Sequence, residues 1–201
     1  MRAHPWLTAT VVAVTAALLI VTLLGGWARS SPEGPAQAEP GTTVEAEPFR
    51  IRLDEASARF VVNGDGAEPG QAYVVVEGQI ELAAMESVAA GTLTDAITAD
   101  LTDAYDQFGS PIKVPAPVVR VRADGSSLLG LGPGLAYDVE IVFIVAEQSV
   151  PRRMTVTLLE HTRRASALDG DLGWYDEAPV ARVTLDVAPL PAVRPEPEGL
   201  R

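Results

Sequence analysis

The sequence contains no cysteine. This absence excludes disulfide bonds, thiolate metal ligands, a cysteine nucleophile and a lipid-modified N-terminal cysteine. Aromatic residues make up only 5% of the chain, so valine, leucine, isoleucine and alanine are expected to fill the core. Histidine is also scarce, with His4 next to an apolar segment and His161 in the body of the chain. A two-histidine metal site within one domain is therefore excluded, and the sequence predicts neither a metal nor a cofactor.

Basic residues are also scarce. The chain has 15 basic residues against 27 acidic ones, for a formal net charge of −12, and Lys113 is its only lysine. Such a surface repels phosphate backbones, so a nucleic-acid partner is not expected. The simplest reason for the charge is solubility, because like-charged molecules repel one another.

One long apolar run stands at the N-terminus. No residue between Trp6 and Trp27 is charged, and at about 1.5 Å per residue the run spans roughly 30 Å, the thickness of a bilayer's hydrocarbon core. Tryptophan at both ends is typical of membrane interfaces. The sequence therefore predicts a cytoplasmic head (residues 1–5) and a transmembrane helix (residues 6–28). The expected location is the cell membrane, single-pass, with the C-terminal domain extracytoplasmic.

Two alternatives stay open in this region. A cleaved signal peptide also begins with an apolar run, and Ala36-Gln37-Ala38 has the small-x-small form of a cleavage site. That site lies well beyond a run that is long for a signal peptide, which favours an uncleaved anchor. Ala9, Ala13 and Ala17 have the spacing at which another helix can pack closely, although alanine is common enough for chance to explain it.

Proline and glutamate dominate the next segment. Residues 29–48 lack an apolar period and predict an extended stalk. Residues 189–201 have a similar composition and predict a disordered tail. The region between them, residues 49–188, is expected to form one domain.

Alternating patterns between turn residues fill this domain. Phe49, Ile51 and Leu53 alternate with charged residues, as in a half-buried strand. Further strands are expected at 58–62, 73–82, 119–122, 137–145, 153–159 and 180–187. Short strands without strand–helix–strand alternation predict an all-β fold, an antiparallel β-sandwich.

The segment 93–108 fits two patterns. Leu93, Ile97, Leu101 and Phe108 could lie on one face of a helix that Gly109 would end. Residues 97–102 also alternate with a period of two, which is typical of a strand. The strand is the favoured interpretation.

Several short motifs are shared with a known type of domain. They are Tyr73-Val74-Val75-Val76, Gly109-Ser110-Pro111, Ala123-Asp124-Gly125, and Leu131-Gly132-Pro133-Gly134 leading into the strand 138–145. On these motifs, residues 49–188 resemble the small immunoglobulin-like extracytoplasmic domains of anchored envelope proteins in high-GC Gram-positive bacteria. The resemblance implies an immunoglobulin-like antiparallel β-sandwich behind one N-terminal transmembrane helix. It implies no site residues, because these domains share no enzymatic activity.

Candidate catalytic chemistry is limited to His161. A serine–histidine–acid triad would have to use this residue, which is expected to be exposed, and no serine lies in a nucleophile-elbow motif. A calcium site is the other candidate, because Asp169, Asp171, Asp176 and Glu177 gather near glycines in a predicted loop. Their spacing is not that of an EF-hand, and such residues are also ordinary in turns.

The same region holds four possible interaction residues. Trp174 and Tyr175 could form a recognition tip, or fold back over the end of the sandwich, which is favoured. Arg163 and Arg164 could form a basic patch for an acidic partner, unless nearby carboxylates neutralise them. We therefore predict a non-enzymatic membrane protein that presents its sandwich to a protein or cell-wall partner, for example within a membrane complex. A hydrolase using His161 and a calcium-binding module are the alternatives.

Overall fold

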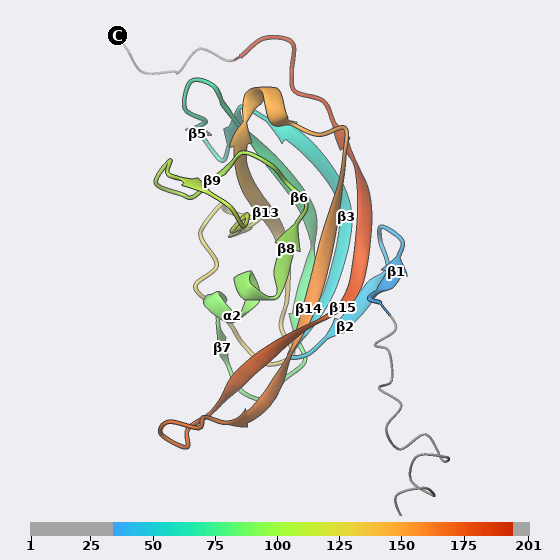
Figure 1. Ribbon diagram of the computed structural model, residues 1–201, viewed down its shortest axis with the longest axis vertical. Helices are drawn as coiled ribbons and strands as arrows, with labels where there is room; N and C mark the ends of the chain where they lie inside the picture. The colour runs from blue at the N-terminus through green and yellow to red at the C-terminus, as the bar shows by residue number, and fades with distance from the viewer. Residues whose placement is uncertain (1–33, 195–201) are drawn as a thin grey trace, which may run out of the picture. The chain divides into compact units, whose positions relative to one another are not determined.

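The computed structural model describes residues 34–194, and this part of the chain is mainly β (Figure 1). The prediction of a β fold is thus confirmed for the described residues. The predicted head and transmembrane helix, and the alanine spacing within that helix, lie outside them. Within residues 34–194, no helix has the length and the apolar character needed to cross a membrane.

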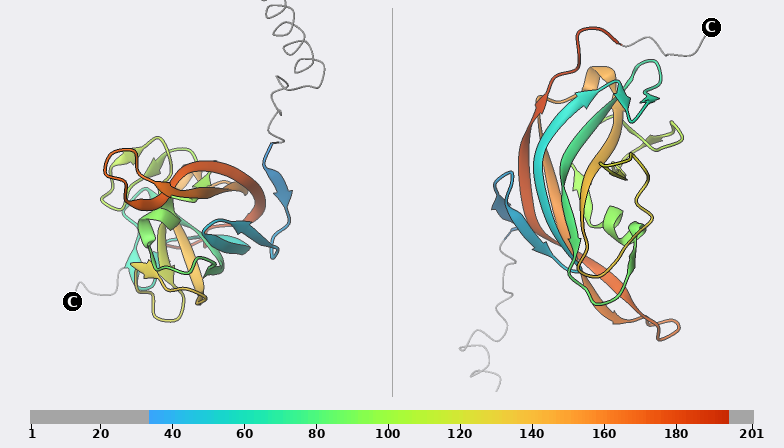
Figure 2. Two further views of the ribbon diagram at one scale, coloured as in Figure 1. Left: turned by 90° about the horizontal axis from the view of Figure 1, so that it is seen from below. Right: turned by 180° about the vertical axis from the view of Figure 1, so that it is seen from behind.

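Five long strands form the body of the domain. They are β3 (Phe49–Arg59), β6 (Gln71–Leu82), β13 (Ala136–Ala146), β14 (Arg153–Ala165) and β15 (Leu172–Ala188). β6 pairs antiparallel with β3 and with β13, and β14 pairs antiparallel with β15. The two groups join where the end of β15 runs parallel to β3. The result is one strongly curved sheet whose two halves face each other (Figure 2).

The core lies between these halves and follows from side-chain alternation. On β14, Met154, Val156 and Leu158 point inward, while the residues between them stay at least partly exposed. They pack in one cluster with inward residues of the opposite half, such as Phe49 and Phe143. Burial of this apolar surface is the main stabilising contribution, because no disulfide is available.

Shorter elements cover the edges and ends of the sheet. The short strands are β1 (Ala36–Ala38), β2 (Thr43–Ala46), β4 (Val61–Val62), β5 (Asp65–Gly66), β7 (Val88–Ala89), β8 (Ile97–Ala99), β9 (Ala104–Tyr105), β10 (Pro111–Ile112), β11 (Val118–Val121) and β12 (Gly130–Leu131). One α-helix, α2 (Ala90–Asp95), and one 3-10 helix, η1 (Glu147–Ser149), are also present in the described part.

The folded domain begins earlier than the sequence predicts. β1 runs parallel to β15, β2 pairs antiparallel with β3, and Ala46 is fully buried. The stalk prediction is therefore wrong for residues 36–46, because the edges of the sheet supply hydrogen bonds that a polar, proline-rich composition does not reveal. Ala36-Gln37-Ala38 is β1 itself, so cleavage after Ala38 would remove a strand of the sheet.

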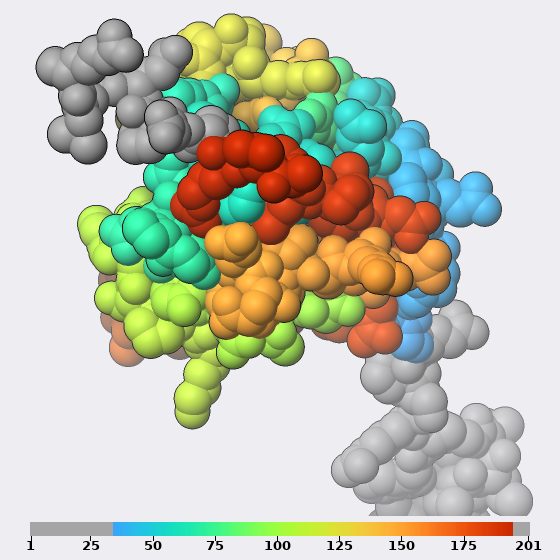
Figure 3. Space-filling view, turned by 90° about the horizontal axis from the view of Figure 1, so that it is seen from above, coloured from blue at the N-terminus to red at the C-terminus, as the bar shows by residue number. Residues whose placement is uncertain are grey.

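The tail prediction is wrong for residues 189–194. Arg194 donates hydrogen bonds to the backbone carbonyls of Ala67, Glu68 and Gln71, and its guanidinium forms an ion pair with Glu147. The same guanidinium lies 4.3 Å above the ring of Phe60. Figure 3 shows this C-terminal segment, in red, lying across one end of the domain.

The ambiguous segment 93–108 contains both predicted structures in succession. α2 buries Leu93 and ends at Asp95, and β8 then pairs with β14 and buries Ile97. α2 has only six residues and buries one side chain, Leu93, so it is too short to account for the helical spacing of apolar residues across the whole segment. The favoured strand is therefore correct only for residues 97–99, and the helix is a short one that starts at Ala90, before the predicted segment.

Candidate functional site

A projecting hairpin contains all four predicted interaction residues. β14 and β15 continue beyond the body of the sheet and form a long hairpin at one end of the domain (Figures 1 and 2). Arg163 pairs across it with Trp174, and Thr162 pairs with Tyr175. We call residues 162–175 the projecting hairpin. The sequence predicted a loop at residues 169–177, which is wrong from Leu172 onward because those residues belong to β15.

Ion pairs neutralise both arginines of the projecting hairpin. Two nitrogens of Arg164 donate to the carboxylate of Asp176, and the guanidinium lies 4.8 Å from the centre of the Tyr175 ring. The hydrogen bond from Arg164 lowers the pKa of the Asp176 carboxyl below its ordinary value. Arg163 forms an ion pair with Glu86. Nearby carboxylates therefore neutralise both Arg163 and Arg164, and the two residues do not form a free basic patch.

The aromatic pair also differs from a recognition tip. Trp174 is partly buried and packs against the main hydrophobic core, as the favoured interpretation expects. The exposed apolar residues of the projecting hairpin are instead two leucines near its turn. Leu168 is 98% exposed and Leu172 is 66% exposed. Sequence reasoning missed both, because two leucines on either side of Asp169-Gly170-Asp171 give no sign that the segments beyond them pair into a hairpin.

His161 lies at the base of the projecting hairpin and is buried, with only 3% of its surface exposed. The expectation of an exposed histidine is wrong because a shift in register between Glu160 and Thr162 turns the side chain inward. Its backbone N–H donates to the carbonyl of Glu47 at 2.6 Å. Nε2 of the ring lies 3.9 Å from a carboxylate oxygen of Glu177, and Nδ1 has no hydrogen-bond partner among the described residues. No serine or threonine hydroxyl of residues 34–194 hydrogen-bonds the ring, so a nucleophile is not in place there.

The predicted calcium ligands do not converge. Asp169 accepts a hydrogen bond from the backbone N–H of Asp171 within the turn, and Asp176 is occupied by Arg164. Hydrogen bonds from Ser166 and from that N–H lower the pKa of the Asp169 carboxyl, as in an ordinary polar turn. Across residues 34–194, no group of three or more histidine, aspartate or glutamate side chains is arranged to hold a metal ion.

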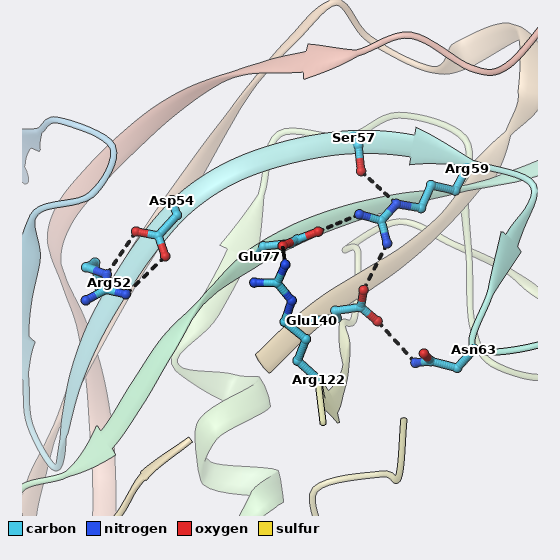
Figure 4. Close-up of polar contacts among 8 residues, drawn as sticks. All are labelled: Arg52, Asp54, Ser57, Arg59, Asn63, Glu77, Arg122 and Glu140. Carbon is cyan, nitrogen blue, oxygen red and sulfur yellow. Dashed lines mark hydrogen bonds and ion pairs between the residues drawn. The ribbon is translucent and has the colours of Figure 1, made fainter. Parts of the chain in front are cut away.

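The structure also contains a buried charge network that the sequence analysis missed. Glu77 on β6 and Glu140 on β13 are directly opposite each other in the sheet, and each is 6% exposed. Arg59 lies between them, with one nitrogen 2.5 Å from Glu77 and another 2.9 Å from Glu140 (Figure 4). Arg122 binds the second oxygen of Glu77, and Asn63 donates to the second oxygen of Glu140.

This network is balanced in charge and saturated in hydrogen bonds. Its two carboxylates and two guanidinium groups sum to zero, and each glutamate receives a donor on each oxygen. Burial alone would lower the pKa of Arg59, but the hydrogen bonds that Arg59 donates to both glutamates, together with their negative charges, outweigh it and raise the pKa. Carboxylates so fully engaged are not available as acid, base or nucleophile. The network ties β3, β6 and β13 together, and we interpret it as structural.

A weak signal for the network exists in the sequence. Glu77 interrupts the predicted strand 73–82 directly after the run Tyr73–Val76, and Glu140 interrupts the most apolar predicted strand. A lone charge in a strand buried on both faces needs a partner, since an unpaired buried charge is costly. The partners cannot be read from the sequence, because Arg59 and Arg122 lie in other strands or turns.

Comparisons with known proteins leave the family of the chain open. No protein-family model matches it, and neither does any curated protein. Among solved structures, an uncharacterised β-sandwich protein from Clostridium difficile is similar with a TM-score of 0.47 and 12% identity, over 79% of this chain and 100% of that one. A candidate lipoprotein from Bacillus subtilis has a TM-score of 0.43 and 10% identity, over 76% of this chain and 39% of that one. A candidate lipoprotein from Staphylococcus aureus has a TM-score of 0.44 and 6% identity, over 77% of this chain and 97% of that one.

Proposed function

We propose that this chain is a non-enzymatic, membrane-anchored protein whose extracytoplasmic β-sandwich, of the immunoglobulin-like kind, binds a partner protein through the projecting hairpin. The observation that carries the proposal is the pair of leucines at the end of that hairpin. Leu168 and Leu172 lie beyond the body of the sheet and expose most of their apolar surface to water. Burying the two side chains on a partner would contribute about 1.5–3 kcal/mol each.

The construction of the hairpin supports this role. A long two-stranded ribbon is marginal by itself, but here Trp174 packs on the core, the ion pair of Arg164 with Asp176 links the two strands, and Arg163 ties the hairpin to Glu86 outside it. A ribbon held in one conformation loses less entropy when a partner binds its end. Asp169 and Asp171 lie between the two leucines, so we expect the partner to offer apolar contacts together with basic groups.

The extracytoplasmic location rests on the N-terminal sequence. The uncharged run between Trp6 and Trp27 has the length of a membrane span, and the β domain follows it in the chain. We therefore propose that binding through the projecting hairpin takes place outside the cytoplasm. Cell fractionation with protease protection tests this part: recovery of the full-length protein in the soluble cytoplasm would overturn it.

Site-specific photo-crosslinking in living cells tests the proposed interface. A photoreactive residue is placed at Leu168, and as a control at Val61, which is 37% exposed on β4. β4 pairs with β5, and Figure 1 shows β5 at the end of the domain opposite the projecting hairpin. We expect one defined crosslinked species from position 168 and none from position 61. The double variant L168E/L172E should lose co-purification of that species while keeping the wild-type melting temperature. Equal crosslinking from both positions, or none from position 168, would overturn the proposal.

A further inference from the structure

The outer face of β14 and β15 carries a polar hollow, away from the projecting hairpin. Its volume is about 340 Å³. The side chains that line it come from β1, β14, β15 and the end of β8: Gln37, Asp100, Thr155, Thr157, Arg182 and Thr184. None of them is apolar, in contrast to the opposite face of the same strands, where Val156 and Val183 are buried in the core.

Strand register brings these side chains together. Arg182 lies opposite Gln37 of β1 on one side and opposite Thr157 of β14 on the other. One step along the same face, Thr184 lies opposite Thr155, and their hydroxyl oxygens are 3.4 Å apart. Neighbouring strands are about 4.8 Å apart, and residues two apart on a strand about 6.6 Å. The polar groups of the hollow are therefore spaced about 4.8 Å apart across the strands and about 6.6 Å apart along them.

Arg182 is unusual in this acidic protein. Nine of the eleven arginines among residues 34–194 form ion pairs with carboxylates. The two that do not, within this part of the chain, are Arg152 and Arg182. Acidic residues outnumber basic ones by 27 to 15, so carboxylate partners are not scarce. The lack of one at an arginine therefore needs another reason. Arg182 places its charge in the hollow, whereas Arg152 is not among the residues that line it.

The lining groups together define the ligand chemistry. A guanidinium binds a planar carboxylate through two parallel hydrogen bonds. Three threonine hydroxyls and the Gln37 amide can both donate and accept, as a ligand rich in hydroxyls requires. Asp100 accepts the backbone N–H of Thr155 at 2.5 Å with one oxygen, which leaves the other oxygen to accept from a ligand hydroxyl.

The charge of the protein and the composition of the lining narrow the range of possible ligands further. A dianionic phosphate would meet Asp100 and the net charge of −12, whereas a monoanionic carboxylate suffers less repulsion. No aromatic side chain lines the hollow, so an aromatic ligand would find no surface for stacking. We propose that the hollow binds a carboxylated saccharide, with its carboxylate on Arg182 and its hydroxyls on the threonines and Asp100.

Calorimetric titration of the full-length protein in detergent tests this site. The probe is galacturonic acid, which carries a single carboxylate, and its neutral counterpart is galactose. We expect the wild-type protein to bind the acidic probe and to bind the neutral one at least about tenfold more weakly, since a charge-assisted bidentate pair is lost. R182Q should weaken binding of the acidic probe by a similar factor. R152Q is the matched control, because it removes the other unpaired arginine, and it should bind as the wild type does.

Three results would overturn the proposal. The first is the absence of binding by the wild-type protein. The second is equal weakening by R152Q and R182Q, which would mean that only the total charge matters. The third is competition by acetate at the same concentration as the sugar, which would show a simple anion contact without recognition of the hydroxyls. None of these measurements involves the projecting hairpin, so crosslinking at Leu168 stands or fails independently.

Discussion

Removing Glu140 tests whether the buried network holds the sheet together. E140A leaves Arg59 without one of its two carboxylates and leaves the amide of Asn63 without an acceptor. Breaking a buried ion pair by deleting one partner typically costs about 3–5 kcal/mol. The side chain of Arg59 is 32% exposed, so water can reach part of the orphaned charge. We therefore expect a loss of about 2–3 kcal/mol, at or just below the lower end of that range.

Urea unfolding, followed by circular dichroism, measures this loss. With a typical slope of about 2 kcal/mol per molar urea, the midpoint should fall by about 1–1.5 M. The melting temperature should fall by about 5–10 °C. E140Q keeps one acceptor oxygen and should fall between E140A and the wild type.

E45A is the control for E140A, because it removes a carboxylate from an exposed ion pair with Arg50, in which the Glu45 side chain is 69% exposed. An exposed pair contributes at most about 1 kcal/mol. If E140A is no more destabilised than E45A, the interpretation of the network as a structural tie is refuted.

Three further predictions follow from local geometry. NMR titration should show the pKa of Asp176 below 3.8 in the wild type and closer to 3.8 in R164Q. Because folding lowers this pKa, the Arg164–Asp176 ion pair stabilises the hairpin fully above pH 3.8, and the stabilisation is lost as the pH falls through the lowered pKa. An added Cβ at Gly78 would lie 2.1 Å from a backbone oxygen of β3, so G78A should lose at least about 2 kcal/mol in urea unfolding, whereas G91A, with open space around it, should lose nothing. R194A should speed hydrogen exchange at the Gly70–Gln71 end of β6, since the C-terminal segment is held there by hydrogen bonds from Arg194 to backbone carbonyls; unchanged exchange would show that this contact is dispensable.

Local patterns in the sequence predicted much of the fold. The strands β3, β6, β13 and β14 were found because apolar and polar residues alternate along each of them, or because they are long and rich in β-branched residues. The ends were predicted less well. β1, β2 and the segment that ends at Arg194 contain proline and charged residues, and they are ordered by hydrogen bonds to distant parts of the chain that leave no periodic pattern.

The candidate sites depend even more on long-range pairing. Alternation of Thr155 and Thr157 with buried residues marks one exposed face of β14. The hollow exists only because β15 places Arg182 opposite Thr157, and because β1 brings Gln37 alongside. Likewise, a one-residue shift in the pairing of β14 and β15 buries His161, which the sequence alone predicts to be exposed.

The sequence by itself determined the composition-dependent features: a cysteine-free acidic chain, a β-rich domain, and an apolar N-terminal run long enough for a bilayer. These features depend on local periodicity and on solvation, which short stretches of residues carry. Only the tertiary structure decided which charges are buried, which arginine is left unpaired and which leucines project into solvent. Those properties depend on strand register between residues as far apart in the sequence as Gln37 and Arg182, and no local pattern contains that information.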